Sequence, residues 1–243
     1  MPVNRVTAGV GPVQRETLEA LQNMRSDQEA AVLVSDLSGA WQCLLDGDLR
    51  VRAGDTLPPS LQSAVQSALA ADRSQVVDAE PGRAFVQVFS PPLRMIIVGA
   101  VHIAQFLAPM AVLAGYQVEV VDPRRSFAAD ARFPGVSMHK IWPDDALQAL
   151  RPDRRTAVVT LTHDPKIDDP ALVEALKSDA FYVGSLGSRR THAQRIERLA
   201  AAGVSQHDIE RIHAPVGLDI RASSPAEIAV SALAQITARL RAG

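Results

Sequence analysis

The sequence has little cysteine and no long apolar run. A single cysteine, Cys43, excludes an internal disulfide framework. No apolar stretch approaches the length of a membrane-spanning helix, and the first five residues carry no charged-then-apolar signal. The net charge is −2 and no basic patch is dense enough to indicate nucleic acid as a ligand. We therefore expect a cytoplasmic protein with no nucleic-acid partner and no stable membrane insertion.

Residue groups that bind metals or catalyse reactions are also missing. The six histidines are scattered, and the sequence has no Cys-x-x-Cys or His-x-x-x-His pair. A Ser-His-Asp triad cannot be inferred, because such triads are recognised by geometry and not by order in the chain. Cys43 lies in a strand-like apolar stretch without a neighbour that would lower its pKa, which predicts a buried free thiol. The sequence predicts no catalytic residue and no metal site.

The chain contains enough apolar sequence for a large core, with 47% hydrophobic residues in 243. In the first part, strand-like runs lie at 30–35, 40–45, 76–77 and 85–89, and helical patterns lie at 17–24 and from 61 onward. Ser90-Pro-Pro92 then interrupts the pattern, and we place a domain boundary there. Residues 1–92 are predicted to form a small α+β domain.

The stretch from Met95 to Ala104 organises the rest of the chain. Three apolar residues at 96–98 are followed by Gly99, and a helical pattern then continues to Gly115. A second apolar run ends in Asp122, 23 residues after Gly99, close to the spacing of a ribose-binding acid. Strand, glycine turn, helix, strand and acid open a dinucleotide-binding unit. The sequence therefore predicts an α/β protein whose residues 93–243 form a Rossmann-like domain around a parallel sheet.

The glycine pattern of this unit is incomplete. A G-x-G-x-x-G motif would place glycine at 99, 101 and 104, but the chain has Val101 and Ala104 at the last two positions. Alanine is a known variant at the third position, whereas a β-branched residue at the second obstructs the approach of a pyrophosphate to the backbone. We therefore expect a Rossmann-type fold without an ordinary NAD site.

The α/β alternation continues beyond Asp122. Further strands are predicted at 136–139, 156–161 and 180–183, with a short strand at 213–216. Helices are predicted from Asp169-Pro170 and from a Ser188 cap, and Ser224 with Glu227 forms a capping box for the last helix. Right-handed crossovers give the strand order 3-2-1-4-5. The loops after strands 1, 4 and 5 should then share the carboxyl edge of the sheet, where a ligand binds.

Two of these loops have residues suited to a charged ligand, each with a simpler alternative. Gly184–Arg190 combines glycines, serines and two arginines before a helix, which suits an anion, or it is a glycine turn and helix cap with solvated arginines. His163 could bind a ligand or move a proton, or it could bond the backbone of its own loop. His102, in the first helical turn after Gly99, has the same ambiguity.

Three C-terminal segments resemble the XdhC/CoxI family, whose members are accessory factors for molybdenum hydroxylases such as xanthine dehydrogenase and carbon monoxide dehydrogenase. They are Leu161-Thr-His-Asp-Pro-Lys166 with Asp168-Asp-Pro-Ala-Leu172, Phe181-Tyr-Val-Gly-Ser-Leu-Gly-Ser-Arg-Arg-Thr-His192, and His213-Ala-Pro-Val-Gly-Leu-Asp-Ile220 with Ser224-Pro-Ala-Glu-Ile-Ala229. The resemblance covers roughly residues 94–240. It implies a Rossmann-like C-terminal domain in a non-catalytic maturation factor.

The resemblance also implies a ligand, partners and a pocket. The ligand would be molybdenum cofactor, a phosphate-bearing pterin, or its cytosine dinucleotide. The partners would be an apo molybdenum hydroxylase and cofactor-biosynthesis proteins, with a homodimer left open. Matched position by position, the cofactor-binding residues would be Gly99, His102, Asp122, His163, Asp164, Gly184, Ser185, Gly187, Arg189 and Arg190.

The chain departs from the family at several places. Val101 replaces the second glycine of a Gly-Ala-Gly-His turn, and Arg221 stands where glycine often follows Leu-Asp-Ile. The family's Gly-Gly-Cys-Val-Glu-like loop is not recognisable in the first domain. Two rival functions remain: an NAD(P)-dependent oxidoreductase that uses Asp122 for ribose and His163 as acid or base, and a protein that only bridges partners.

Overall fold

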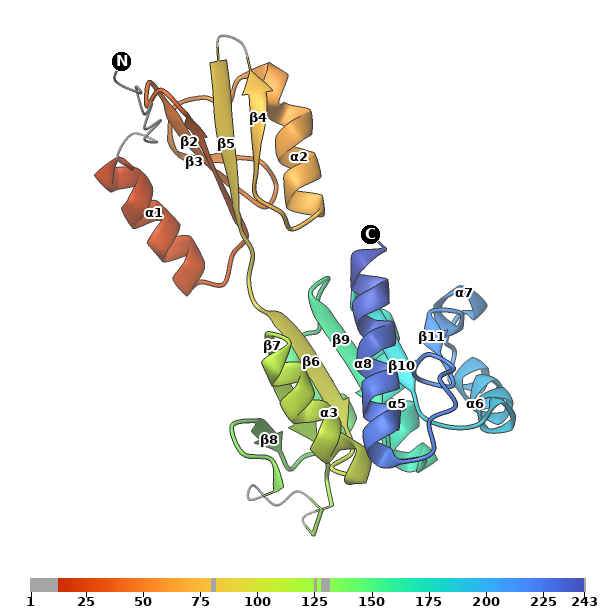
Figure 1. The fold of residues 1–243 in the computed structure, drawn as a ribbon. Helices are drawn as coiled ribbons and strands as arrows, with labels where there is room; N and C mark the ends of the chain where they lie inside the picture. Colours follow the sequence, from red (N-terminus) through yellow and green to blue (C-terminus); the bar gives the residue numbers. More distant parts are fainter. Residues whose placement is uncertain (1–12, 80–81, 125, 128–131, 243) are drawn as a thin grey trace, which may run out of the picture. The chain divides into compact units, whose positions relative to one another are not determined.

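The chain divides into two compact units, residues 1–91 and 92–242. The computed structural model describes residues 13–79, 82–124, 126–127 and 132–242. The two units contain different sheets, one antiparallel and one parallel (Figure 1). Both belong to an α/β protein, as the sequence predicts. Among the described residues, none of the helices has the length and apolar character needed to cross a membrane.

The first unit is a five-stranded antiparallel sheet with strand order β3-β2-β1-β5-β4. Its strands are β1 (Ala31–Asp36), β2 (Gln42–Asp46), β3 (Val51–Gly54), β4 (Gln75–Ala79) and β5 (Gly82–Phe89). The helices are α1 (Arg15–Ser26), the short 3-10 helix η1 (Pro59–Leu61) and α2 (Gln62–Ala70). Strand β3 is not predicted from the sequence, because this four-residue strand has only one buried side chain and shows little apolar alternation.

Side chains of the central strand β1 point to opposite faces of this sheet. Val32 and Val34 pack with residues of α2, while Ala31 and Leu33 pack with residues of α1. Cys43 packs on the same side as α2 and its side chain is fully buried. The pKa of the Cys43 thiol is raised to about 11, mainly by burial and to a smaller extent by the nearby charge of Asp55. The prediction of a buried free thiol is confirmed.

The second unit is a six-stranded parallel sheet with strand order β11-β10-β9-β6-β7-β8. Its strands are β6 (Leu93–Val98), β7 (Tyr116–Val121), β8 (Ser137–His139), β9 (Thr156–Thr160), β10 (Tyr182–Ser185) and β11 (Ile212–His213). Counted within the unit, the order is 3-2-1-4-5-6. The predicted order 3-2-1-4-5 is confirmed, with β11 added at the edge.

Helices cover both faces of the parallel sheet (Figure 1). They are α3 (His102–Leu113), α4 (Pro143–Leu150), α5 (Pro165–Lys177), α6 (Arg189–Ala201), α7 (Gln206–Ile209) and α8 (Pro225–Arg241). Met95 and Ile97 of β6 pack with residues of α3 and α8, whereas Ile96 and Val98 pack with residues of α4, α5 and α6. Burial on both faces explains why the strand is a continuous apolar run.

Several boundaries differ from the prediction: the strand predicted at 213–216, for example, is Ile212–His213. The differences at α5 and β10 affect the candidate site. Helix α5 begins at Pro165, because Asp164 caps it by accepting a hydrogen bond from the Lys166 amide. The predicted start at Asp169-Pro170 is wrong, since an identical Asp-Pro signal occurs five residues earlier and Pro170 is tolerated inside the helix. Strand β10 covers Tyr182–Ser185 instead of 180–183, so it includes two residues that were predicted to belong to a loop.

Candidate functional site

Four loops leave the parallel sheet at the same level. Val98, the last residue of β6, pairs with Val121 of β7 and with Thr160 of β9, and Thr160 pairs with Ser185 of β10. The strand order reverses direction at β6, because its two neighbours lead to opposite halves of the sheet. The expected meeting of these loops at one edge is confirmed, and this edge is the candidate site.

The loops after β6 and β9 approach each other closely at Gly99. Its φ is +109°, a conformation that disfavours side chains, and a Cβ added there would lie 2.5 Å from Thr162 Cγ2. The Gly99 amide donates to the Val121 carbonyl over 2.8 Å. Gly99 therefore bonds to the end of β7 and lies against the loop after β9, and both its conformation and its neighbour Thr162 favour glycine.

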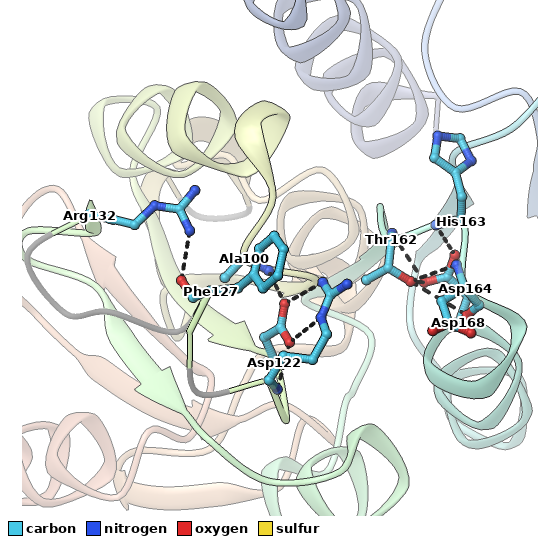
Figure 2. Close-up of polar contacts among 9 residues, drawn as sticks. Ala100, Asp122, Phe127, Arg132, Thr162, His163, Asp164 and Asp168 are labelled. Atoms are coloured by element: carbon cyan, nitrogen blue, oxygen red, sulfur yellow. Dashed lines mark hydrogen bonds and ion pairs between the residues drawn. The ribbon is translucent and has the colours of Figure 1, made fainter.

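Asp122 fixes the turn from inside the protein (Figure 2). Its side chain is fully buried, and Oδ2 accepts from the Ala100 amide over 2.8 Å. Arg124 donates from Nε to Oδ1 over 2.9 Å and from Nη2 to Oδ2 over 2.8 Å. Burial alone would raise the pKa of this carboxyl, but the bonds from Arg124 and the Ala100 amide outweigh it and lower the pKa. In this conformation both carboxylate oxygens bind protein groups, which differs from an acid that awaits a ribose.

Asp168 has the same role in the loop after β9. Its buried carboxylate accepts from Thr162 Oγ1 over 2.7 Å and from the His163 amide over 3.0 Å. Burial raises the pKa of Asp168, against the opposing effects of the Thr162 bonds and the charge of Arg195. The His163 backbone has a φ of +61°, and its exposed imidazole points away from Asp168 (Figure 2). The loop thus presents the His163 side chain to solvent.

Two predicted pocket residues lie inside β10 and are committed to packing. A Cβ added at Gly184 would lie 2.6 Å from Tyr182 Cε1 and 2.9 Å from Val216 Cγ2, so glycine makes room for both side chains. The buried Ser185 hydroxyl lies 2.6 Å from Thr160 Oγ1 and bonds it. The structure places Gly184 and Ser185 beneath the site and not on its surface.

The loop after β10 presents two free guanidinium groups. Gly187 has a φ of +141°, and Ser188 caps α6 by accepting from the Thr191 amide over 3.2 Å. Arg189 and Arg190 follow in the first turn with exposed side chains. In the described part of the chain these two side chains have no ion pair or hydrogen bond. They are therefore available to an anionic ligand.

The first turn of α3 completes the edge. Val101 is the N-cap residue, with φ −86°, and the helix has no side-chain cap. The valine is half-buried and packs against the core, so its side chain is directed inward. His102 is exposed, with its ring 6.2 Å from that of Phe106. The uncapped amides of this turn and the imidazole can both face a ligand.

Three residues that order the site are not predicted from the sequence: Arg124, Asp168 and Arg195. Arg195 is buried on α6, where Nη2 donates to the Leu186 carbonyl over 2.9 Å, while Nε and Nη1 have no partner among the described residues. A signal existed for two of them. Arg195 lies four residues before the inward-facing Leu199, and Asp168 lies four residues before the inward-facing Leu172.

Comparison with known proteins shows which sequences and structures this chain resembles. The chain is 32% identical over 148 residues to the molybdenum cofactor insertion chaperone PaoD of Escherichia coli K12, covering 61% of this chain and 40% of PaoD. It is 31% identical over 153 residues to a probable xanthine dehydrogenase subunit of Bacillus subtilis 168, covering 63% of this chain and 44% of that protein. The chain spans less than half the length of the curated relatives it matches.

A solved structure has the same fold. The crystal structure of a xanthine dehydrogenase from Bacillus halodurans superposes with a TM-score of 0.70 at 23% identity, over 95% of this chain and 66% of that one. At this identity the likeness shows the fold alone. The sequence model of the XdhC Rossmann domain matches residues 95–236, which is more than half of the chain. The chain therefore belongs to the XdhC family and carries the XdhC Rossmann domain in its second unit.

Proposed function

We propose that this chain binds molybdenum cofactor, as the pterin or its cytosine dinucleotide, and hands it to an apo molybdenum hydroxylase. The names of two relatives support this function: one is a molybdenum cofactor insertion chaperone and the other is a probable component of xanthine dehydrogenase. The cofactor is cargo, received from cofactor-biosynthesis proteins in the cytoplasm and passed on. The chain's contribution is binding and release, without a catalytic residue.

The observation that carries the proposal is the set of uncommitted groups at the switch-point edge. His102, His163, Arg189 and Arg190 are exposed, and their side chains have no hydrogen bond or ion pair within the described residues. The first turn of α3 adds backbone amides without a side-chain cap. Guanidinium groups and helix N-terminal amides both stabilise phosphate, and molybdenum cofactor carries phosphate.

The buried residues around this edge support binding in a different way. Asp122 and Asp168 each accept bonds from loop amides, so the loops are ordered before a ligand arrives. Gly99, Asp164 and Gly187 set the turns, while Gly184 and Ser185 pack below them. We assign Arg189, Arg190, His102 and His163 to direct contact and the other predicted residues to positioning. Exposed charge pairs are weak enough individually to allow cargo to leave.

Retention of cofactor tests this function. The protein is purified from a cofactor-replete host, and bound molybdenum and pterin fluorescence are measured. Arg189→Ala with Arg190→Ala should retain severalfold less of both, because phosphate loses two charge-assisted partners. Arg154→Ala is the matched control, since this exposed arginine precedes β9 at the opposite edge of the sheet. Thermal unfolding should be similar in all three proteins.

Delivery is measured by adding loaded protein to an apo molybdenum hydroxylase and following the appearance of its activity. Loaded wild-type protein should activate it faster than an equal amount of free cofactor. Absence of bound cofactor together with no gain in activation would overturn the proposal. An NAD(P)-dependent oxidoreductase would instead show fluorescence transfer from bound NADH. The bonds that occupy both oxygens of Asp122 count against that outcome.

A further inference from the structure

A cavity of about 420 Å³ lies beside the carboxyl end of β10, within the second unit. Its walls come from the loop that leads into α6, from residues 215–222, and from the first turns of α8. The volume lies in the range of small-molecule sites. Arg189, one of the uncommitted arginines of the candidate site, is part of the wall, so the cavity is continuous with that site.

The inner wall of the cavity is apolar and ordered. Leu186, Val216 and Ile228 supply its apolar side chains, and all three pack in or against the core beneath α8. The Val216 amide donates to the Ser185 carbonyl over 3.1 Å. Gln235 accepts from the Gly217 amide over 2.9 Å and donates to the Gly217 carbonyl over 3.2 Å. These bonds fix the segment to β10 and α8, so the wall exists without a ligand.

Three charged residues stand at the cavity, and they do not neutralise one another. Arg189, Asp219 and Arg221 all line it. Within the described residues, neither arginine side chain has an ion pair or hydrogen bond. Asp219 Oδ1 accepts a long bond of 3.4 Å from the Arg221 amide, and Oδ2 has no partner in the described part of the chain. Charges that pair with each other would leave nothing for a ligand, whereas these three are free to bind one.

Arg221 also has an unfavourable backbone conformation. Its φ is +58°, in the left-handed region that a residue with a β-carbon rarely adopts. Glycine would adopt this conformation without strain. Strain of this kind is characteristic of ligand sites, where the gain comes from the side chain. Here the side chain contributes a second guanidinium to a cavity that already has Arg189.

We propose that this cavity binds an aminopyrimidine ring that carries phosphate. The flat ring lies against Leu186, Val216 and Ile228. Asp219 accepts a hydrogen bond from the exocyclic amine of the ring, as carboxylates do with the amine of cytosine. Arg189 and Arg221 pair with the phosphate groups. This inference rests on the proposed function, since the ring would be part of the cargo, and it adds the place and the residues that recognise it.

Cytosine nucleotides and pterins share this chemistry, and separate ligands distinguish the two sources. Full-length protein is titrated calorimetrically with cytidine diphosphate, uridine diphosphate, a phosphate-free pterin and inorganic phosphate. Uracil presents a carbonyl where cytosine presents an amine, so Asp219 should repel it. We expect cytidine diphosphate to bind about tenfold more tightly than uridine diphosphate, as expected for one lost hydrogen bond to a charged group. Pterin that competes with cytidine diphosphate would identify the pterin end as a second occupant of the same cavity.

Two variants test whether Asp219 and Arg221 recognise the ligand. Asp219→Asn should reduce the preference for cytidine over uridine diphosphate to about twofold or less, because the amide can also donate to uracil. Arg221→Gly should weaken cytidine diphosphate severalfold and leave the unfolding temperature equal or higher, because glycine relieves the strained backbone. Arg154→Ala, at the opposite edge of the sheet, is the control and should bind as wild type.

Equal affinity for the two nucleotides, or affinity insensitive to both variants, would overturn the cavity assignment. The result is separable from the test of the proposed function. Cofactor retention and delivery that are unaffected by Asp219→Asn and Arg221→Gly leave the chaperone function standing and remove the cavity. Nucleotide binding with the expected variant pattern, but without cofactor delivery, keeps the cavity and removes the chaperone function.

Discussion

Gly99 and Thr162 meet where the loops after β6 and β9 come together: a Cβ added at Gly99 would lie 2.5 Å from Thr162 Cγ2. Non-bonded carbon atoms do not approach this closely, so the Thr162 side chain or one of the two loops would have to shift. Thr162 is itself fixed by the bond of its hydroxyl to the buried Asp168. The close approach of Gly99 and Thr162 therefore links the loop after β6 to the loop after β9, and Asp168 holds the second of these loops in place.

Gly99→Ala should lower the free energy of unfolding by about 2–4 kcal/mol, from the left-handed conformation and the clash together. Gly115→Ala is the control, because Gly115 has a φ of +90° but no atom within 4 Å of an added Cβ. It should cost only about 1–2 kcal/mol. Thr162→Ser, which removes Cγ2 and keeps the hydroxyl, should restore part of the loss in Gly99→Ala. Equal losses for the two glycine variants in urea unfolding would contradict the steric argument.

Asp122→Asn should lower the free energy of unfolding by about 1–3 kcal/mol, because Arg124 loses its charged acceptor and one buried oxygen becomes an amide donor facing other donors. Asp145→Asn makes the same charge change at an exposed position in the first turn of α4 and should cost less than about 1 kcal/mol. Chemical denaturation measures both. A similar small effect of the two variants would show that the Asp122 pair contributes little.

Lowering the pH should remove the contribution of the Asp122 carboxylate to the free energy of unfolding. Its pKa is lowered from the usual 3.8 in the folded protein, although burial opposes this, because Arg124 and the Ala100 amide favour the charged form. A folded-state pKa below that of the unfolded chain gives stability that is present above about pH 4 and is lost as the pH falls through the lowered value. The gap in unfolding free energy between wild type and Asp122→Asn should therefore narrow from about pH 5 to about pH 3. A gap that stays constant over this range would contradict the assigned pKa direction.

Arg195→Met should raise the pKa of Asp168. Burial already raises this pKa, and the positive charge of Arg195 is among the effects that hold it down. Carboxyl carbon chemical shifts followed through a pH titration report it directly. Arg198→Met is the matched control, because Arg198 pairs with Asp169 and its effect on the pKa of Asp168 is smaller than that of Arg195. An unchanged Asp168 titration in Arg195→Met would refute the coupling.

Sequence patterns are sufficient to predict the parallel sheet, because the apolar runs, glycines and helix caps that mark its elements are local features of the chain. The apolar run 95–98, the glycine after it and the run that ends before Asp122 specify strand, turn and strand in order. Ser188 and the Ser224–Glu227 capping box mark two helix starts, and both are confirmed. The start of α5 was wrong because two Asp-Pro pairs lie five residues apart and carry the same local signal.

The candidate site is harder to predict from the sequence than the sheet is. The spacing of Asp122 from Gly99 matches a ribose-binding acid, but spacing does not show that Arg124 occupies its carboxylate. Gly184 and Ser185 look like part of a glycine-rich loop, yet β10 includes them. The cavity beside Arg221 combines the loop before α6 with residues 215–222 and the first turns of α8, so no single motif describes it.

For the parallel sheet, the sequence by itself determined the order of strands β6, β7, β8, β9 and β10 and the edge at which the loops meet, because apolar periodicity, caps and right-handed crossovers act locally or by fixed rules. Only the tertiary structure decided which side chains remain available at that edge. Whether Asp122 or Ser185 is free depends on partners such as the Ala100 amide and Thr160, which the fold brings near. Hydrogen bonding and burial are properties of the packed protein, and a residue's type and position in the chain do not fix them.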